Sequence, residues 1–340
     1  MIKVLFYLTG IYNGGTEIAL HNLVSCIDKT KYDIYVTYTD KENSDIEIIN
    51  KIKPYVNFIN IEDRFSIDIL IYCTDALNDK EILLENIKYK KSYFWFHYFW
   101  PSQEEFLKYT INNNLIDGVI AVSQTTKDKL LKLQDFTIEE NKISVIHNIL
   151  NSNSILEKSL EPVTMDLSDE LNLITVARLA PVKGYERVKY LADALLAKNI
   201  NFKWFILGKA NNSEKEYDQK IKKLLEPYKN IYFLGEQQNP YKYMKNCDYT
   251  VILSERETWS LVITESKILG IPCITTDFDG VIEQITPMEN GIIISRENVN
   301  TYYNKVDDII NDKEKLKENL KNFKYDISNI LNKWDELLIL

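Results

Sequence analysis

The stretch YTVILSERETWSLVITESKILGIPCITTDFDG, residues 249–280, contains an apolar run, a polar loop, a helical pattern and a second apolar run in immediate succession. The apolar runs at residues 249–254 and 271–276 are short and rich in β-branched residues, which is typical of strands covered on both faces. A strand, a helix and a second such strand in this order indicate a parallel sheet with helices on its faces.

Two acids lie between these strands. Glu257 belongs to the polar loop, and Glu265 lies about two helical turns further along, in a predicted helix of about three turns that ends at Gly270. Carboxylates that reach different depths of a binding cleft can accept hydrogen bonds from hydroxyls at both ends of a polyhydroxylated ligand. Glu283 is a third candidate. The predicted helix would turn an apolar face to the core, formed by Leu261, Ile268 and Leu269.

The same alternation of short apolar runs and helical patterns extends over the whole chain. The segment Leu150–Glu170, rich in Ser, Asn and acids, interrupts it and is predicted to be a linker. We therefore predict an α/β protein with two doubly wound, Rossmann-like parallel-sheet domains, residues 1–155 and residues 170–320. Ligands bind beyond the carboxyl ends of such strands, and two such sheets would face a deep cleft.

The composition excludes several classes of protein. The 340 residues, 45% of them hydrophobic, suffice for two cores, and the net charge of −9 argues against binding to nucleic acid. The four cysteines form no C-x-x-C pair, which predicts buried free thiols, no zinc site and a reducing cytoplasm. No apolar run approaches the roughly 18 residues of a membrane span, and the first residues, MIKVLFYLTG, indicate a strand rather than a signal peptide.

Glycines and cations follow the first strand of each predicted domain. TGIYNGGTEIAL places Gly10, Gly14 and Gly15 before a helix, without the lysine of a phosphate loop. Such a turn either is a plain tight turn or lets backbone amides approach an anion. VARLAPVKGYERV carries Arg178 and Lys183 between strand and helix. The planar guanidinium of Arg178 and the flexible ammonium of Lys183 at that place suit a diphosphate, although two solvated cations would give the same pattern.

Aromatic residues gather at the end of one strand of the first domain, in YFWFHYFWPSQEEF. Phe94 and Phe96 are predicted to be buried strand residues. His97, Tyr98 and Trp100 follow the strand, where they either pack as a loop or face the cleft. Flat aromatic faces with a polar rim suit a sugar or a lipid-linked acceptor.

Taken together, the motifs GG-T-E, ARLAPVKG, S-x-x-E-T-W-S-L-V-I-T-E-S and ENGIII resemble the retaining glycosyltransferases of family 4, which have the GT-B fold. The similarity runs over the whole chain and is strongest from Leu173 to Ile294. It implies that the second domain binds a nucleotide sugar and the first an acceptor. It also implies that a final helix, residues 321–340, packs back on the first domain.

The resemblance implies a role for each matching residue. Glu265 would hold the ribose hydroxyls, and Glu257 would contact hydroxyls of the donor sugar. Arg178 and Lys183 would bind the diphosphate, together with amides near Gly15. Further donor contacts would come from Gly208, Glu236, Gln237, Thr258, Trp259, Ser260 and Leu261.

The same resemblance implies a first-domain part of the site. His97 would lie near the donor sugar and the acceptor, and Tyr98 and Trp100 would contact the acceptor. The catalytic set would then be Glu257, His97, Arg178 and Lys183.

The chain departs from the family pattern in its glycines. The usual E-G-F-G is Glu257-Thr258-Trp259-Ser260 here, so both glycines that would expose backbone amides to the sugar are replaced. The glycine-rich turn of the phosphate strand is reduced to GKA at Gly208, and only Gly280 follows Asp279 where two glycines are usual. None of these changes removes a charged group.

The implied reaction moves a hexosyl or N-acetylhexosaminyl group from a nucleotide diphosphate sugar to a hydroxyl of a glycan, glycolipid or protein-linked acceptor, in surface polysaccharide or glycoconjugate synthesis. UDP is the commonest nucleotide of such donors. Cations and helix amides would stabilise the leaving diphosphate, so we expect neither a cofactor nor a metal. A sugar-nucleotide epimerase and a non-catalytic subunit stay open as alternatives. The expected location is cytoplasmic, and the sequence leaves open a contact with the inner face of the membrane, the oligomeric state, the donor sugar and the acceptor.

Overall fold

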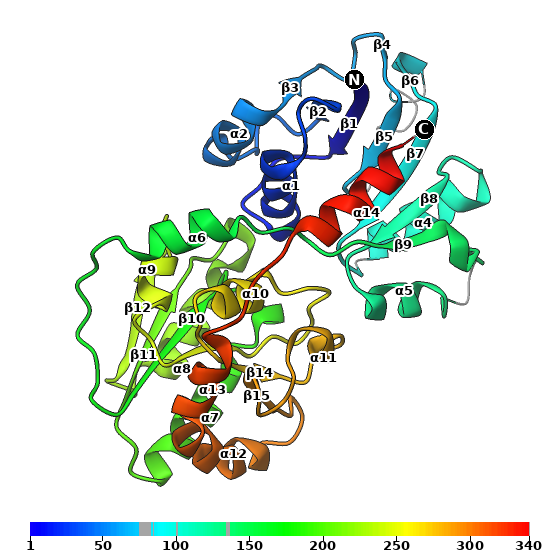
Figure 1. Ribbon diagram of the computed structural model, residues 1–340. Helices are drawn as coiled ribbons and strands as arrows, with labels where there is room; N and C mark the ends of the chain where they lie inside the picture. The colour runs from blue at the N-terminus through cyan, green and yellow to red at the C-terminus, as the bar shows by residue number, and fades with distance from the viewer. Residues whose placement is uncertain (75–82, 84, 100, 134–136, 340) are drawn as a thin grey trace. The chain divides into compact units, whose positions relative to one another are not determined.

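The computed structural model describes residues 1–74, 83, 85–99, 101–133 and 137–339 (Figure 1). The chain divides into two compact units, each with its own parallel sheet and hydrophobic core. The first unit comprises Met1–Leu150 and Asp326–Leu340, and the second comprises Asn151–Tyr325.

The first unit contains a seven-stranded parallel sheet in the order β3-β2-β1-β5-β7-β8-β9. Its strands are β1 (Ile2–Leu8), β2 (Tyr32–Tyr38), β3 (Asn57–Phe58), β5 (Ile69–Tyr72), β7 (Lys91–Phe96), β8 (Gly118–Ala121) and β9 (Ile143–Val145). Two short strands, β4 (Phe65–Ser66) and β6 (Ile87–Lys88), pair separately. The strands wind outward from β1 in both directions, so the order reverses between β1 and β5. That switch point is where sheets of this kind bind ligands.

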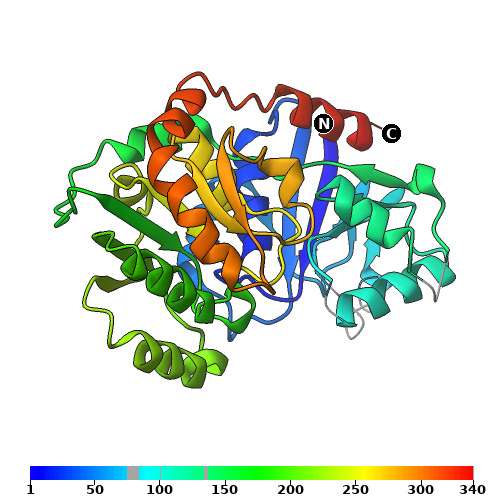
Figure 2. The ribbon, with the colours of Figure 1, turned by 90° about the horizontal axis from the view of Figure 1, so that it is seen from below.

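The helices of the first unit are α1 (Gly15–Cys26), α2 (Ile46–Ile52), α4 (Pro101–Asn112), α5 (Gln124–Leu130) and α14 (Ser328–Leu338), with one-turn 3₁₀ helices η1 (Lys53–Tyr55) and η2 (Glu140–Lys142). Phe94 and Phe96 are fully buried, as predicted, and their rings meet edge to face at 5.6 Å. Helix α14 joins this unit through Trp334, whose ring lies 5.0 Å from that of Trp95. The two ends of the chain lie near each other on this unit (Figure 2).

The second unit contains a six-stranded parallel sheet in the order β12-β11-β10-β13-β14-β15. Its strands are β10 (Leu171–Val176), β11 (Phe202–Leu207), β12 (Ile231–Gly235), β13 (Tyr249–Ile252), β14 (Cys273–Thr276) and β15 (Gly291–Ile294). The central strand β10 pairs on both sides, with Leu173 opposite Trp204 of β11 and opposite Tyr249 of β13. The order reverses between β10 and β13, which makes their carboxyl ends the switch point of this sheet.

The helices of the second unit are α6 (Ser152–Ser159), α7 (Glu186–Ala197), α8 (Lys215–Leu225), α9 (Tyr241–Met244), α10 (Leu261–Ile268), α11 (Val281–Gln284), α12 (Asn300–Asn311) and α13 (Lys313–Leu320), with η3 (Pro181–Lys183) and η4 (Asn212–Glu214). Helix α7 shows why these segments are helical. Its Val188, Leu191 and Leu195 recur at intervals of three and four, and all three are buried against the sheet. The central Trp204 is fully buried in the same core.

Two local predictions differ from the structure. The predicted linker Leu150–Glu170 contains helix α6, which Asn151 caps by accepting the N–H of Ser154 at 3.0 Å. Helix α10 has two turns rather than three, because Gly270 adopts φ +73° and ends it.

The apolar face of α10 also differs from the prediction. Ile263 is fully buried and packs with Ile252 and Cys273. Leu269, just after the helix, is buried as predicted, whereas Leu261 and Ile268 are only half-buried. The helix meets the strands with the face that carries Ile263, so Leu261 and Ile268 lie at the flanks of the contact.

The cysteines are free, and three of them, Cys73, Cys247 and Cys273, are buried, as predicted; Cys26 is half-buried. Across the described ranges, no helix combines the length and the apolar character that a membrane span requires.

Candidate functional site

The two loops that leave β10 and β13 lie directly against each other at the switch point of the second sheet. The backbone N–H of Glu255 donates to the carbonyl of Val182 at 2.8 Å. Gly184 has φ +65°, and a Cβ there would lie 2.0 Å from the carbonyl oxygen of Leu253. Only glycine fits this contact, so Gly184 allows the loop after β10 to pack closely against the loop after β13.

Lys183 and Glu257 meet where these loops touch. Lys183 Nζ lies 2.7 Å from Glu257 Oε1, and the hydroxyl of Ser254 donates to the same oxygen at 2.8 Å. The two charged side chains are only 26% and 13% exposed. Partial burial weakens solvent screening, so the attraction of either group for a ligand is stronger than at an open surface. The structure thus brings together the predicted cation and the first predicted acid.

Glu265, the second acid, lies on α10 and is 8% exposed. The hydroxyl of Tyr241, from α9, donates to Glu265 Oε1 at 3.0 Å. Burial raises the pKa of the Glu265 carboxyl to about 7. This acid therefore lies near the balance between its neutral and charged forms at neutral pH, and hydroxyl donors from a ligand would favour the charged form.

Arg178 lies in the same β10–α7 connection but has a different partner. Its Nη1 is 3.5 Å from Glu214 of η4, and the side chain is 39% exposed. Gly208, at the end of β11, has φ +143°, and a Cβ there would lie 1.9 Å from the carbonyl of Ala177. The turn after β11 therefore lies against the start of the loop that carries Arg178, so both lie at the carboxyl ends of the strands.

Two further residues predicted to contact the donor, Glu236 and Gln237, follow the end of β12. Glu236 forms an ion pair with Lys209. The side chain of Gln237 donates to the carbonyl of Leu234 at 2.7 Å and accepts from the hydroxyl of Tyr243 at 3.1 Å. These contacts fix the positions of both side chains beside the strand ends.

The loop that replaces the family's E-G-F-G ends in the helix cap of α10. Ser260 is the buried N-cap residue, while Thr258, Trp259 and Leu261 are half-buried. Glu283, the third acid, is half-buried on α11. The predicted donor residues of the second unit therefore gather on the carboxyl side of one sheet, and whether they bind a donor remains a prediction.

Several side chains that hold this edge together were not predicted. Arg187 forms an ion pair with Glu255, and the guanidinium of Arg296 donates to the Glu255 carbonyl at 2.5 Å. Arg296 also pairs with Asp277 at 3.1 Å, which ties the loops after β13, β14 and β15 together. Tyr241, Ser254 and Gln284 were missed as well, because the sequence does not show which buried group each of these side chains meets.

The first unit places its glycines at the start of α1. Gly14 caps this helix, and the position of a Cβ on Gly15 is open for 4 Å around. Glu17 is 4% exposed, accepts the N–H of Tyr12 at 3.3 Å, and has a pKa that burial raises to about 7. The amides near Gly15 thus share their turn with a buried acid. A bound anion would favour the neutral form of Glu17.

His97 follows β7 in the first unit and is 7% exposed. Its ring lies 4.4 Å from that of Trp95, and burial lowers its pKa to about 3. The imidazole is therefore neutral at physiological pH. Tyr98 is half-buried next to it, and Trp100 lies outside the described residues.

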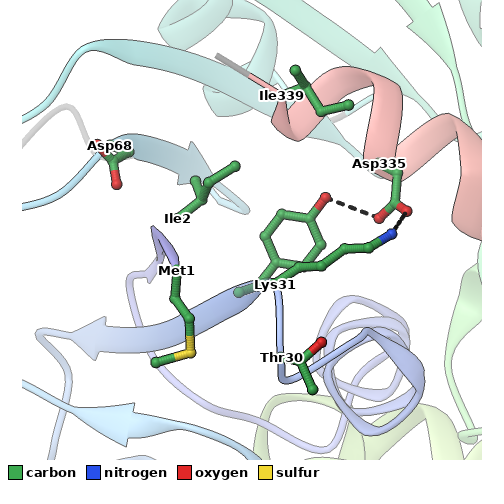
Figure 3. Close-up of a pocket in the computed structure, with 8 residues that line it drawn as sticks. Met1, Ile2, Thr30, Lys31, Asp68, Asp335 and Ile339 are labelled. Carbon is green, nitrogen blue, oxygen red and sulfur yellow. Dashed lines mark hydrogen bonds and ion pairs between the residues drawn. The ribbon is translucent and has the colours of Figure 1, made fainter.

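A separate pocket of about 570 Å³ opens at the opposite edge of the first sheet, where β1 and β2 begin (Figure 3). Its charged groups already pair with protein partners. Asp335 accepts from Lys31 at 2.6 Å and from the hydroxyl of Tyr32 at 2.9 Å, and Asp68 pairs with Lys90 at 2.7 Å. The contacts of Asp335 anchor α14 to the start of β2, and these ion pairs and hydrogen bonds account for the charged residues of the pocket.

Comparison with known proteins identifies the second unit. Residues 165–326 match the family model of glycosyl transferases group 1. The match covers most of the second unit, and we call these residues the group 1 domain. The group 1 domain therefore contains every predicted donor residue except Gly15.

Two curated bacterial relatives are similar over part of the chain. The capsular polysaccharide biosynthesis glycosyltransferase CapM of Staphylococcus aureus is 25% identical over 59% of this chain and 54% of its own length. The N-acetylgalactosamine-N,N'-diacetylbacillosaminyl-diphospho-undecaprenol 4-alpha-N-acetylgalactosaminyltransferase of Campylobacter jejuni is 28% identical over 56% and 50%. The chain spans about half the length of these two relatives.

The solved structure of Anabaena HepE in complex with UDP and glucose resembles the whole chain, with a TM-score of 0.78, 19% identity and 99% of each chain covered. At this identity the likeness shows the fold alone. The chain has the GT-B fold with two Rossmann-like units, as the sequence predicted. A shared cleft between the two units stays a prediction.

Proposed function

We propose that this protein is a retaining glycosyltransferase of family 4 that transfers a hexosyl or N-acetylhexosaminyl group from a UDP-sugar to a hydroxyl of a glycan, glycolipid or protein-linked acceptor. The observation that carries the proposal is the half-buried pair of Lys183 and Glu257 at the β10–β13 switch point, inside the group 1 domain. The names of the relatives, which concern capsular polysaccharide and an undecaprenol-linked sugar, support a role in surface polysaccharide or glycoconjugate synthesis.

In this proposal the donor lies along the carboxyl edge of the second sheet. Lys183 and Arg178 bind the diphosphate, with help from amides near Gly15. Glu265 accepts hydrogen bonds from the ribose, and Glu257 accepts them from the donor sugar. The base lies near Gly208, Glu236 and Gln237. The terminal helix α14 is part of the acceptor-binding unit.

The chemistry then depends on stabilising the leaving diphosphate. As the bond between the anomeric carbon and the phosphate oxygen breaks, negative charge grows on that oxygen, and the fixed cations compensate it in a partly desolvated site. A metal ion and a cofactor take no part in this step.

Retention follows from attack on the face from which the diphosphate departs. The acceptor hydroxyl forms the new bond to the anomeric carbon, and its proton passes to the departing phosphate oxygen, so no side chain becomes a nucleophile. Glu257 positions sugar hydroxyls as a hydrogen-bond acceptor, and the hydroxyl of Ser254 holds its carboxylate in place once the diphosphate has taken Lys183. His97, a neutral ring, and Tyr98 contribute to the site near the acceptor.

The test is to incubate the protein with UDP-glucose, UDP-galactose and UDP-N-acetylglucosamine, with and without lipid-linked and free glycan acceptors. We expect UDP release that depends on the acceptor, and a product in which NMR finds the anomeric configuration of the donor. Formation of an isomeric UDP-sugar without acceptor would identify an epimerase instead. If the protein binds the donor but neither transfers the sugar nor slowly hydrolyses the donor, a non-catalytic subunit is favoured.

The place of the reaction is part of the same proposal. UDP-sugars are made in the cytoplasm, so an acceptor linked to a lipid would be met at the inner face of the membrane. Fractionation of cells that produce the protein, with and without a wash at high salt, tests this, since a peripheral contact based on charge is released by salt.

A further inference from the structure

The loop that carries Glu257 is anchored at both of its ends. At its first end, Glu257 is held by Lys183 and Ser254. At its last end, Ser260 is held by the side chain of Gln284 from α11. Thr258 and Trp259 span the distance between these anchors, at the place where the family's pattern has its first glycine and its aromatic residue.

The contact of Gln284 with Ser260 uses both ends of one carboxamide. The N–H of Ser260 donates to Gln284 Oε1 at 2.9 Å, and Gln284 Nε2 donates to the carbonyl of Ser260 at 2.8 Å. The same Nε2 lies 3.2 Å from Thr264 Oγ1. All three residues are 5% exposed. Two hydrogen bonds to buried backbone groups fix the direction of the side chain, and leaving those groups unpaired would cost free energy of folding.

This contact offers a physical reason why the loop tolerates the loss of two glycines. Glycines would let the loop adapt its backbone to the sugar. Here the backbone of Ser260 is bound to a buried amide that comes from a segment 24 residues further along. The loop is therefore pre-organised rather than adaptable, and its geometry relative to Glu257 is set in advance.

We infer that Gln284 is a positioning residue that fixes the sugar-facing loop, and that it sets the affinity for the sugar moiety of the donor separately from the affinity for the nucleotide. This inference rests on the proposed function, in which the Glu257 loop meets the sugar and Glu265 meets the ribose. Gln284 acts through Ser260 and Thr264 and is not itself assigned a contact with the donor.

The test compares Gln284→Met with a matched control at the amino ends of the strands of the same sheet. Asn172 makes the same two-point contact with a backbone, accepting from the N–H of Ser168 at 2.6 Å and donating to its carbonyl at 2.8 Å. It is 7% exposed and lies near the amino end of β10. Asn172→Leu therefore removes an equivalent buried contact without touching the loop of Glu257.

We would measure the Kd of UDP and of the best-bound UDP-sugar by calorimetry for each protein, together with thermal unfolding. For Gln284→Met we expect the Kd of UDP to stay within about twofold and the ratio of the UDP-sugar Kd to the UDP Kd to rise about tenfold or more. For Asn172→Leu we expect a lower melting temperature and an unchanged ratio. Should Gln284→Met fail to fold, Gln284→Asn, whose shorter side chain cannot span both groups of Ser260, supplies the same ratio.

Two results would separate the inference from the proposed function. A wild-type protein that binds neither UDP nor any UDP-sugar contradicts the proposed function, and the inference falls with it. A wild-type protein that binds both, with a Gln284 variant that leaves their ratio unchanged or that weakens both ligands equally, overturns the role of Gln284 alone.

Discussion

Lys183 Nζ lies 2.7 Å from Glu257 Oε1, although the two side chains are assigned to different parts of the donor. Without a ligand, each group therefore satisfies the charge of the other. A half-buried cation without such a partner would be costly, because desolvation would be uncompensated. Binding of a nucleotide sugar would exchange partners, since the diphosphate would take Lys183 and the sugar hydroxyls would take Glu257. In the ligand-free protein, the ion pair therefore compensates the two charges that a bound nucleotide sugar would otherwise contact.

Replacing Lys183 tests whether this side chain binds the diphosphate. We expect Lys183→Met to weaken UDP binding on the order of 10- to 100-fold, because a hydrogen bond to a charged group contributes about 1.5–3 kcal/mol. Lys220→Met is the matched control, since Lys220 is 66% exposed and pairs with Glu186 on the outer surface. Calorimetric titration with UDP measures both. If Lys183→Met binds UDP as tightly as Lys220→Met, the assignment of Lys183 to the diphosphate is wrong.

Glu265 gives a pH dependence with a defined sign. Its pKa is raised from 4.5 to about 7 in the folded protein, so the native state holds a proton that the unfolded chain has released between these values. Its contribution to stability is therefore fully present below about pH 4.5 and is lost as the pH rises through about 7. We expect Glu265→Gln to gain on the order of 2 kcal/mol relative to wild type between pH 5 and pH 8, measured by urea unfolding.

Glu17 has a pKa shifted in the same direction, but it is present in both proteins and cancels in this comparison. The same variant also tests the ligand contact. UDP affinity of the wild-type protein should rise as the pH increases through about 7, because ribose hydroxyls favour the charged carboxylate, and Glu265→Gln should lose this rise. Parallel stability profiles for the two proteins would contradict the raised pKa.

Gly184 tests the contact between the β10 and β13 loops. Gly184 and Gly270 both have positive φ, +65° and +73°, but a Cβ on Gly184 would lie 2.0 Å from the Leu253 carbonyl while Gly270 has open space within 4 Å. We expect Gly270→Ala to cost about 1–2 kcal/mol, from the backbone conformation alone. Gly184→Ala should cost clearly more and also weaken UDP binding. Equal losses of unfolding free energy would show that the close approach of the two loops is not a constraint.

Trp334 tests the attachment of α14 to the first unit. Its indole is 1% exposed and packs on Trp95, whose ring in turn lies 4.4 Å from that of His97. We expect Trp334→Ala to lower the free energy of unfolding of this unit by about 3–5 kcal/mol and to shift the NMR signals of His97. Ile339→Ala, at a side chain that is 60% exposed, should change stability by less than about 0.5 kcal/mol. A Trp334 variant as stable as the Ile339 variant would contradict this packing.

The sequence predicted the fold well because its strands are apolar on both faces and separated by helical patterns. It missed α6, since that helix buries few apolar side chains, Ile155 among them, within a polar segment. The apolar face of α10 was misassigned because Leu261 and Ile268 fit the period as well as Ile263 does, and only the position of the strands decides between them.

The candidate site divides in the same way. Lys183, Glu257 and Glu265 could be found because they follow strands at the reversal of the sheet order, and the resemblance of their motifs was specific. The roles of Tyr241 and Gln284 could not be found, because they depend on which buried group each side chain meets. Gln284 follows the exposed Ile282 and the half-buried Glu283, so nothing in the local pattern distinguishes it.

The most direct test of the central claim is an experimental structure of the protein with an intact UDP-sugar bound. We predict that the diphosphate lies within hydrogen-bond distance of Lys183 and Arg178, that the Lys183–Glu257 ion pair has opened, and that the ribose hydroxyls donate to Glu265. A UDP-sugar bound elsewhere, with the Lys183–Glu257 pair still closed at its present distance of 2.7 Å, would contradict the account.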